Sequence, residues 1–532
     1  MRPRTSVFSG AIAVVAVAAS LAASAQAGAP KSHGPKVSPQ LASLADSLPG
    51  NDDLNVIVLG SDPGRAAGKH GKVEKSLGLI GAVSATVSVD GLDALAADDN
   101  VSFVAPDSPM APNGHGLKSP FSSSLSGTLG SSSSLDSSSL STLYPGRDGA
   151  PNAWSAGLTG AGVGIAVIDS GVVPTTDFGS RLVQVQLSGQ TGSLDDTVGH
   201  GTMVAGVAAG QSPDGHFIGI APAATVYAID VNRPDGVHSS DVITALKWVF
   251  DNAHQYNIRA VNLSLGETLP SSYTQSPLDL AVERLWAAGV FVAVSAGNLG
   301  TAAGAVDYAP ANDPLAFAAG AFDTMGTSGP GDDTDATWSS AGVTIDGFAK
   351  PELLAPGRLI PSVLPSGTLL AAQAPAANWV APGYAAASGT SFAAPQLAGA
   401  AAIVFQGHPG WSPDQVKWLL VAKQGAKVLG SKIGTLDLST AYNFSGTPGL
   451  ANQGVPALVC APLSTCLGAG TIASSWNSNS WNSNSWNSST WNSSTWNSNS
   501  WNVAGWDSSG WTSNSWNSLG WSSNSWNTTV WN

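Results

Sequence analysis

The sequence GIAVIDSG at residues 164–171 decides the fold class. It begins with an uninterrupted apolar run, and a second such run lies at residues 290–294. Continuous apolar strands are typical of parallel sheets that are covered on both faces. Residues 241–256 and 277–288 have the spacing of amphipathic helices. The alternation of strands and helices predicts an α/β domain with a parallel sheet flanked by helices.

Asp169 ends the first apolar strand, directly before the turn-forming Gly171. Active-site residues of parallel α/β sheets collect at the carboxyl ends of the strands. A carboxylate in this place can accept a hydrogen bond from an imidazole and so fix its tautomer. Taken alone, an Asp that merely caps the following turn is an equally good interpretation.

His200 lies in the segment GHGTMVAG, residues 199–206, which reads as the start of a short helix rich in Ala and Gly. The small neighbours let the backbone pack tightly while the imidazole ring points out of the first turn. A single His is more often structural than catalytic, so His200 gains weight only together with other residues.

Ser391 lies in the segment SGTSFAAP, residues 388–395. Gly389 permits an unusual backbone at the turn, and Pro395 fits the first turn of a helix. The apolar residues up to Val404 predict that this helix is buried at the centre of the domain. A Ser at such a helix start lies in a positive field that favours an alkoxide and an oxyanion. An ordinary N-cap Ser is the alternative.

Hydrolysis of a peptide by a serine needs a nucleophile, a base, a carboxylate that orients the base, and donors for the oxyanion. The sequence offers a candidate for each role, and the order Asp, His, Ser is that of the subtilisins. The segments at residues 168–171, 200–202 and 389–391 resemble the three signatures of the subtilisin-like (subtilase) family of serine proteases.

The segment SAGN at residues 295–298 resembles the place where that family keeps its oxyanion-hole Asn. The resemblance implies a subtilisin-like serine endopeptidase in which Asn298 and the backbone N–H of Ser391 stabilise the oxyanion. It also implies that protein or peptide substrates are bound and that no cofactor is required.

Residues 262–266 resemble the strand with which the family pairs its substrate, by hydrogen bonds of the β-addition type. An interior strand end is the alternative interpretation. The resemblance predicts two walls of a pocket, formed by Ser264, Leu265 and Gly266 and by Ala296, Gly297 and Asn298. Residues 361–387 form a long stretch rich in Ala and Pro, which predicts a cleft rim unlike that of the family.

The region before this domain predicts a small α+β domain, with strands at residues 54–59, 82–89 and 101–106 and a helix at 90–96. Residues 54–106 resemble the inhibitory propeptide of the subtilases. This resemblance implies a zymogen that is inhibited by its own propeptide and is cut between Asp107 and Leu143.

The N-terminus reads as an export signal: Arg2 and Arg4, an apolar run at residues 11–23, and the small-x-small site at 25–27. We expect a secreted, extracellular protein, with an uncleaved anchor helix as the alternative. The net charge of −14 argues against binding to nucleic acid, which needs clustered Lys and Arg.

The C-terminal tail is a low-complexity repeat in which Trp recurs every five residues from Trp476 to Trp531 among Asn and Ser. It fits a module that binds glycans or the cell wall, a self-associating β-structured array, or a disordered adhesive segment. Cys460 and Cys466 precede it and are expected to form one local disulfide.

Asp332, Asp333 and Asp335 form an acidic loop that offers carboxylate oxygens to a structural calcium ion. A solvated acidic turn is the better interpretation, because the spacing lacks the full pattern of a calcium-binding loop.

The predicted organisation assigns one role to each part of the chain. The parts are a signal peptide (1–27), a propeptide (28–110), a Ser-rich linker (111–142), a subtilisin-like domain (143–445), a linker with the Cys pair (446–470) and the Trp-repeat tail (471–532). The main alternative function is a cell-surface adhesion or glycan-binding protein with a degenerate protease domain. A serine-carboxyl peptidase fits less well, because it would lack a His as the base.

Overall fold

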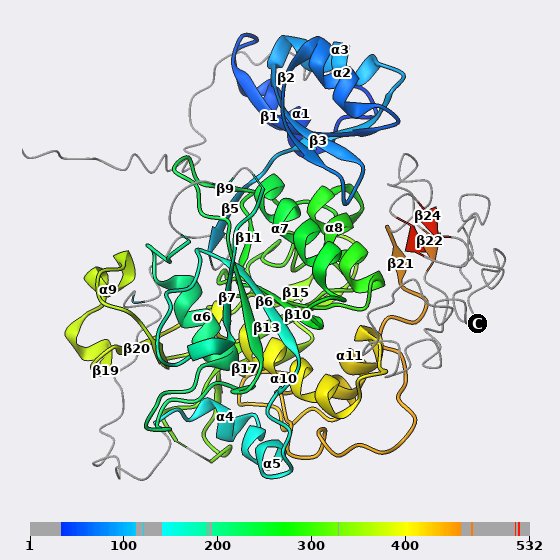
Figure 1. The fold of residues 1–532 in the computed structure, drawn as a ribbon. Coiled ribbons are helices and arrows are strands. Elements are labelled where there is room, and N and C mark those ends of the chain that lie inside the picture. The colour runs from blue at the N-terminus through cyan, green and yellow to red at the C-terminus, as the bar shows by residue number, and fades with distance from the viewer. Residues whose placement is uncertain are drawn as a thin grey trace, which may run out of the picture. The chain divides into compact units, whose positions relative to one another are not determined.

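The computed structural model describes residues 33–112, 121, 141–188, 190, 194–327, 329–458, 470–471, 516–517 and 520–521. Two folded parts stand out, which we call the N-terminal domain (residues 33–106) and the larger domain (residues 141–458) (Figure 1). The expected signal peptide, most of the Ser-rich linker, Cys460, Cys466 and nearly all of the Trp-repeat tail lie outside the described residues.

The N-terminal domain is an antiparallel sheet with helices packed on one face. Its strands follow the order β2-β3-β1-β4, with β1 at Asp53–Gly60, β2 at Gly71–Leu77, β3 at Ala82–Ser88 and β4 at Val101–Pro106. Its helices are α1 (Pro39–Asp46), α2 (Pro63–His70) and α3 (Leu92–Ala97). The sequence predicted β1, β3, β4 and α3 but missed α1, α2 and β2.

Strand β1 is buried on both of its faces because its alternating side chains pack into two different hydrophobic cores. Val56 and Val58 pack with the helices of the N-terminal domain. Ile57 and Leu59 alternate with them and join the core of the larger domain instead. A strand that alternates between two apolar environments reads as a continuous apolar run. The N-terminal sheet therefore lies against the larger domain through its second face.

The larger domain is built on a mainly parallel sheet with the order β14-β13-β12-β10-β6-β8-β7 and with β17 beside β13. All of its neighbouring pairs are parallel except β13 with β14. The strands are β6 (Gly164–Asp169), β7 (Leu182–Val185), β8 (Thr225–Asp230), β10 (Ile258–Leu263), β12 (Phe291–Ser295), β13 (Phe317–Asp323), β14 (Thr334–Asp335) and β17 (Leu353–Pro356).

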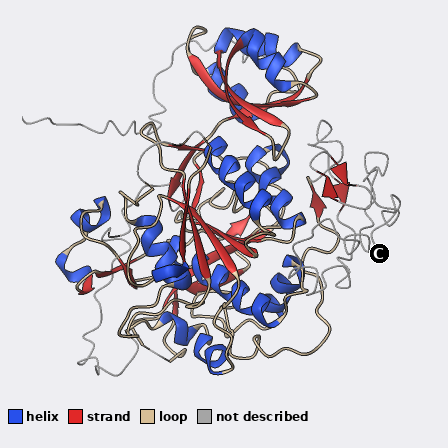
Figure 2. Ribbon diagram, viewed as in Figure 1, coloured by secondary structure: helices blue, strands red, loops and turns tan. Residues whose placement is uncertain are grey.

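Helices surround this sheet, as Figure 2 shows. They are α4 (Tyr144–Arg147), α5 (Ala150–Ser155), α6 (His200–Ala209), α7 (Ser239–Asn252), α8 (Pro277–Ala287), α9 (Leu369–Gln373), α10 (Ala394–Gly407) and α11 (Pro413–Ala422). Every residue of β6, β10 and β12 is buried, so helices cover both faces of these strands. The predicted α/β architecture is confirmed, with small shifts at the ends of α7 and α8.

Helices α6 and α10 are apolar on all sides, which is typical of helices in a protein interior. Their small side chains allow close packing. A methyl group at Gly399 would lie 2.7 Å from the Cβ of Ile220, so only glycine fits there. This packing holds His200, at the start of α6, and the turn with Ser391, just before α10, at fixed places beside the sheet.

Short strands form further small sheets in the larger domain and after it. Residues 361–387 fold into the sheet β18-β20-β19, formed by Ile360–Val363, Tyr384–Ala387 and Trp379–Ala381. Other pairs are β15 (Gly342–Val343) with β16 (Ala349–Lys350), β21 (Pro456–Ala457) with β22 (Gly470–Thr471), and β23 (Trp516–Asn517) with β24 (Gly520–Trp521). Among the described residues, none of the helices has the length and apolar character that crossing a membrane needs.

Candidate active site

Asp169 and His200 form a hydrogen-bonded pair. Asp169 is the last residue of β6, and its two carboxylate oxygens lie 2.8 and 3.0 Å from Nδ1 of His200, the first residue of α6. Both side chains are buried. The pairing makes Nδ1 the donor of a neutral imidazole and leaves Nε2 as its acceptor. No hydrogen bond to Nε2 is found within the part of the chain that the structure describes.

The charges around His200 suit a general base. Burial by itself lowers the pKa of His200, but the charge and hydrogen bond of Asp169, together with the charge of Asp196, outweigh burial. The pKa of His200 is therefore raised above its ordinary value. A carboxylate next to an imidazole stabilises the imidazolium that forms when the base takes a proton.

Ser391 lies in the 3₁₀ turn Thr390–Phe392, just before α10, and not within the helix itself. Its Oγ donates a hydrogen bond to the carbonyl oxygen of Ser264 at 3.1 Å, and Ser264 Oγ donates to the carbonyl oxygen of Ser391 at 2.9 Å. The ring of the next residue, Phe392, lies 5.9 Å from the ring of His200. The structure thus joins Asp169 to His200, while the hydroxyl of Ser391 is bonded to Ser264.

Asn298 follows β12 and is tied to the turn that carries Ser391. Its Oδ1 accepts hydrogen bonds from the backbone N–H and the Oγ1 of Thr390, both at 3.1 Å. The N–H of Gly297 donates to the same Oγ1 at 3.1 Å, and Gly297 has a φ of 100°, which favours glycine. These bonds orient the amide of Asn298 with its oxygen toward Thr390 and its nitrogen as the donor end.

The two expected walls of the substrate pocket meet at the same turn. Ser264 contacts Ser391, and Leu265 and Gly266 continue into β11 (Leu265–Glu267). The other wall, Ala296 and Gly297, reaches the turn through the hydrogen bond to Thr390.

Strand β11 pairs with a segment from the N-terminal side of the chain. Strand β5 (Pro109–Pro112) is antiparallel to β11, with Leu265 opposite Pro112 and Gly266 opposite Ala111. The other edge of β5 pairs with β9 (Val237–His238). Figure 1 shows β5 beside β9 and β11. An extended segment of this chain therefore occupies the strand position at which the sequence predicted a bound peptide.

Asp196 is a residue of the site that the sequence analysis missed. It is buried, and burial raises its pKa, although its hydrogen bonds oppose that shift. Its oxygens accept hydrogen bonds from Ser170 Oγ, Val198 N, Gly199 N, Thr202 N and Thr202 Oγ1, at 2.7–3.0 Å. Ser170 Oγ also lies 3.2 Å from Asp169 Oδ1, so Asp196 braces the start of α6 and the carboxylate of Asp169 together. The feature of the sequence that could have indicated this role is an acidic residue shortly before the helix that begins at Gly199 and His200.

The acidic loop does not gather into a ligand set. Asp333 forms a buried ion pair with Arg147, and Asp332 accepts a hydrogen bond from Thr327 Oγ1 at 2.7 Å. Asp335 pairs through its backbone with Leu429. Across the described ranges, no three His, Cys, Asp or Glu side chains are grouped so that they could hold a metal ion.

Comparison with known proteins identifies the family. Residues 160–449 match the Subtilase family (Peptidase_S8), and the chain belongs to this family. It is 36% identical over 277 residues to serine protease AprX of Bacillus subtilis (strain 168), a match that covers 49% of this chain and 61% of AprX. It is 35% identical over 283 residues to subtilisin Savinase of Lederbergia lenta, covering 53% of this chain and 90% of Savinase.

The fold is also that of a solved relative. Fervidolysin from Fervidobacterium pennivorans, described as a keratinolytic enzyme related to subtilisin, superposes with a TM-score of 0.54 at 22% identity. The match covers 76% of this chain and 62% of fervidolysin. The subtilisin fold of the larger domain is thus established, and the N-terminal antiparallel domain precedes it.

Proposed function

We propose that the chain is a secreted serine endopeptidase, made as a zymogen, with Asp169, His200 and Ser391 as its catalytic triad. The observation that carries the proposal is the buried pair of Asp169 and His200 at the carboxyl end of β6. An imidazole held by a carboxylate through Nδ1 presents Nε2 as a base. Membership of the subtilase family supports peptide bonds as the substrate.

In the proposed reaction each of these groups has one role. Rotation about the Cα–Cβ bond of Ser391 moves its hydroxyl from Ser264 to Nε2 of His200, which takes the proton as Oγ attacks the carbonyl carbon. The amide nitrogen of Asn298 and the backbone N–H of Ser391 donate to the oxyanion. The imidazolium then protonates the leaving amine, and a water molecule, deprotonated by His200, hydrolyses the acyl-enzyme. The reaction written in this way needs no cofactor.

The zymogen part of the proposal rests on β5. The position of β5 between β9 and β11 supports the proposal that it takes the place of an extended substrate. The second face of the N-terminal sheet packs against the larger domain, and β2 contacts α7. We infer that residues 33–112 block the groove until the chain is cut beyond them. For the Trp-repeat tail, contact with glycans or the cell wall stays one prediction beside a self-associating array and a disordered adhesive segment.

Labelling with a fluorophosphonate tests the enzymatic part. The matured wild-type protein is expected to be labelled at Ser391, and Ser391→Ala, cut beyond Pro112 by an added metalloprotease so that its groove is open as well, is expected to stay unlabelled. Ser155→Ala is the matched control, because Ser155 is exposed and bonds only to the backbone of its own helix. Persistence of the label in Ser391→Ala, or its absence from the matured wild type, would overturn the assignment and favour an adhesion protein with a degenerate domain.

Export and maturation are tested separately from the chemistry. We expect the secreted material to begin downstream of Pro112, whereas a fully active chain that begins at residue 28 would contradict the zymogen proposal. N-terminal sequencing of the protein from culture medium distinguishes the two.

A further inference from the structure

Two carboxyl groups bind neighbouring residues of α7 where the N-terminal segment enters the larger domain. Asp107, between β4 and β5, accepts a hydrogen bond from the backbone N–H of Ser240 at 2.8 Å. Glu267, the last residue of β11, accepts one from Ser239 Oγ at 2.6 Å. Ser239 in turn donates its backbone N–H to the carbonyl oxygen of Ser108 at 2.9 Å, and its Oγ lies 3.2 Å from the same oxygen. Both carboxyl groups thus converge on the first residues of α7.

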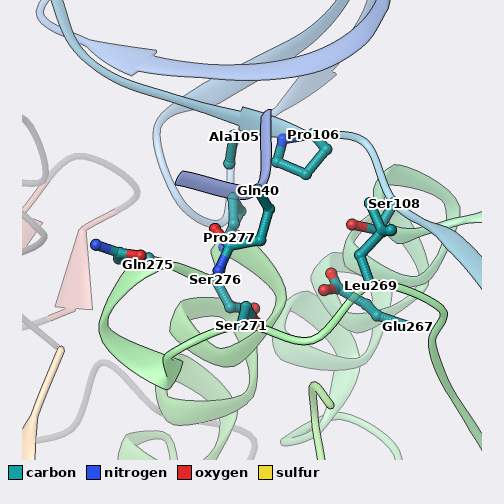
Figure 3. A pocket seen from close by; sticks show the side chains of 10 residues that line it. All are labelled: Gln40, Ala105, Pro106, Ser108, Glu267, Leu269, Ser271, Gln275, Ser276 and Pro277. Atoms are coloured by element: carbon teal, nitrogen blue, oxygen red, sulfur yellow. The ribbon is translucent and has the colours of Figure 1, made fainter. Parts of the chain in front are cut away.

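Both residues are largely buried. Asp107 is 9% exposed and Glu267 is 3% exposed. A small cavity beside Glu267 is lined by residues of both sides, including Gln40 and Ala105 from the N-terminal domain and Ser271 from the larger domain (Figure 3). Separation of the two domains would open this side of Glu267 to water.

The surrounding charges only partly compensate the two acids. Lys75 and Arg233 both pair with Asp241, at 2.7 and 3.3 Å. His238 lies at the start of α7, and its charge and the charge of Lys75 both act on Asp107. On the side of α8, the fully buried Asp279 is a further acid, so this side supplies no cation that could compensate Glu267. Glu267 therefore faces Asp107 and Asp279 in an environment poor in cations.

Burial and like charge act on these groups in the same direction. Burial raises the pKa of Glu267 to about 7, the charge of Asp107 adds to this shift, and the hydrogen bonds of Ser239 and Ser108 oppose it. Burial also raises the pKa of Asp107, against its bonds to Ser240 and the charges of His238 and Lys75. A protonated Glu267 is neutral and tolerates Asp107 nearby, whereas an ionised Glu267 repels it.

We propose that Asp107 and Glu267 form a proton-dependent clasp, which holds the N-terminal segment on the larger domain most tightly in acid and loosens progressively as the pH rises toward neutral. The clasp concerns contacts within the chain. Its consequence, a propeptide that dissociates more readily as the pH rises, rests on the proposed function.

The direction follows from linkage. Glu267 has a raised pKa in the joined state and an ordinary pKa of 4.5 when hydrated, so the joined state binds the proton more tightly. Association is then strongest below the ordinary pKa and weakens by up to about tenfold per pH unit as the pH rises toward 7. Above neutral pH it no longer changes, because Glu267 is ionised in both states.

Hydrogen exchange measured by mass spectrometry tests the clasp in the full chain carrying Ser391→Ala. The readout is the protection of peptides that cover β5 and the start of α7, corrected for the intrinsic exchange rate, between pH 5 and 9. We expect protection to fall by about tenfold per pH unit up to pH 7 and then to level off. In Glu267→Gln, which mimics the protonated group, we expect no such slope.

Asp251→Asn is the matched control, because Asp251 is an exposed acid on α7 that pairs only with Lys247. It should keep the slope of the parent chain. An equal slope in Glu267→Gln and the control, or a parent chain without a slope, overturns the proposal. If Glu267→Gln does not fold, Asp107→Asn replaces it: a shallower slope supports the clasp and an unchanged slope overturns it. The Ser391→Ala chain cannot cleave itself, so this outcome is independent of the labelling test.

Discussion

Asn298 offers the sharpest test of the proposed chemistry, because its side chain does two separable things. Its Oδ1 accepts two hydrogen bonds from Thr390, and its amide nitrogen is assigned to the oxyanion. Asn298→Asp keeps an oxygen for both Thr390 bonds and removes the amide donor. Asn298→Ala removes all of these groups.

The magnitudes of the two effects differ. Loss of one oxyanion donor lowers kcat by about 10²–10³, or about 2.7–4 kcal/mol in the activation free energy. Loss of two neutral hydrogen bonds lowers the free energy of unfolding by about 1–3 kcal/mol, at about 0.5–1.5 kcal/mol each. We therefore expect both variants to lose at least this much activity, with the larger loss in Asn298→Asp because its carboxylate also repels the oxyanion, and only Asn298→Ala to lose this much stability.

The assay combines kcat on a peptide anilide, normalised by active-site titration, with urea unfolding of the same substitutions in the Ser391→Ala background. A kcat for Asn298→Asp within about threefold of the parent enzyme would refute the assignment of the oxyanion donor. A loss of stability in Asn298→Asp as large as that in Asn298→Ala would show that the two Thr390 bonds do not survive the exchange.

Two further predictions concern buried acids. Asp196→Asn removes a charge that raises the pKa of His200, so the acid limb of the kcat/KM profile should move to lower pH; an unmoved limb in a folded variant would show that Asp196 acts only as a brace. Arg147→Ala leaves a buried carboxylate without its partner and should lower the free energy of unfolding by about 3–5 kcal/mol in urea. Lys247→Ala, at an exposed pair, should change it by less than about 1 kcal/mol, and equal losses in these two variants would contradict the argument.

The sequence predicted those parts of the fold whose local pattern and tertiary environment agree. The run that ends at Asp169 is apolar throughout and is buried on both faces, so pattern and structure coincide. Strand β2 carries Lys72, Glu74 and Lys75 on an exposed edge and lacks such a pattern, which explains why it was missed. Helix α2 contains two glycines and depends on the cap at Asp62 and on packing rather than on propensity.

The chemistry of the site was predictable in kind but not in its contacts. Segments at Asp169, His200 and Ser391 carry recognisable local contexts, whereas the role of Asp196 depends on the fold of the loop before α6. The hydrogen bond between Ser391 and Ser264 could not be predicted either, because it joins residues far apart in the chain.

Ser264 connects the state of the nucleophile to the state of the groove. Its carbonyl oxygen accepts the hydroxyl of Ser391, and the next residue, Leu265, begins the strand that pairs with β5. The peptide strand and the resting position of the hydroxyl therefore share one short segment of backbone. In the proposed zymogen, the groove is filled by β5 while the hydroxyl of the nucleophile is bonded to Ser264 and not to its base. The pairing of β5 and the hydrogen bond of Ser391 both depend on the backbone at Ser264 and Leu265. Departure of β5 would therefore open the groove and change the surroundings of Ser391 in the same step.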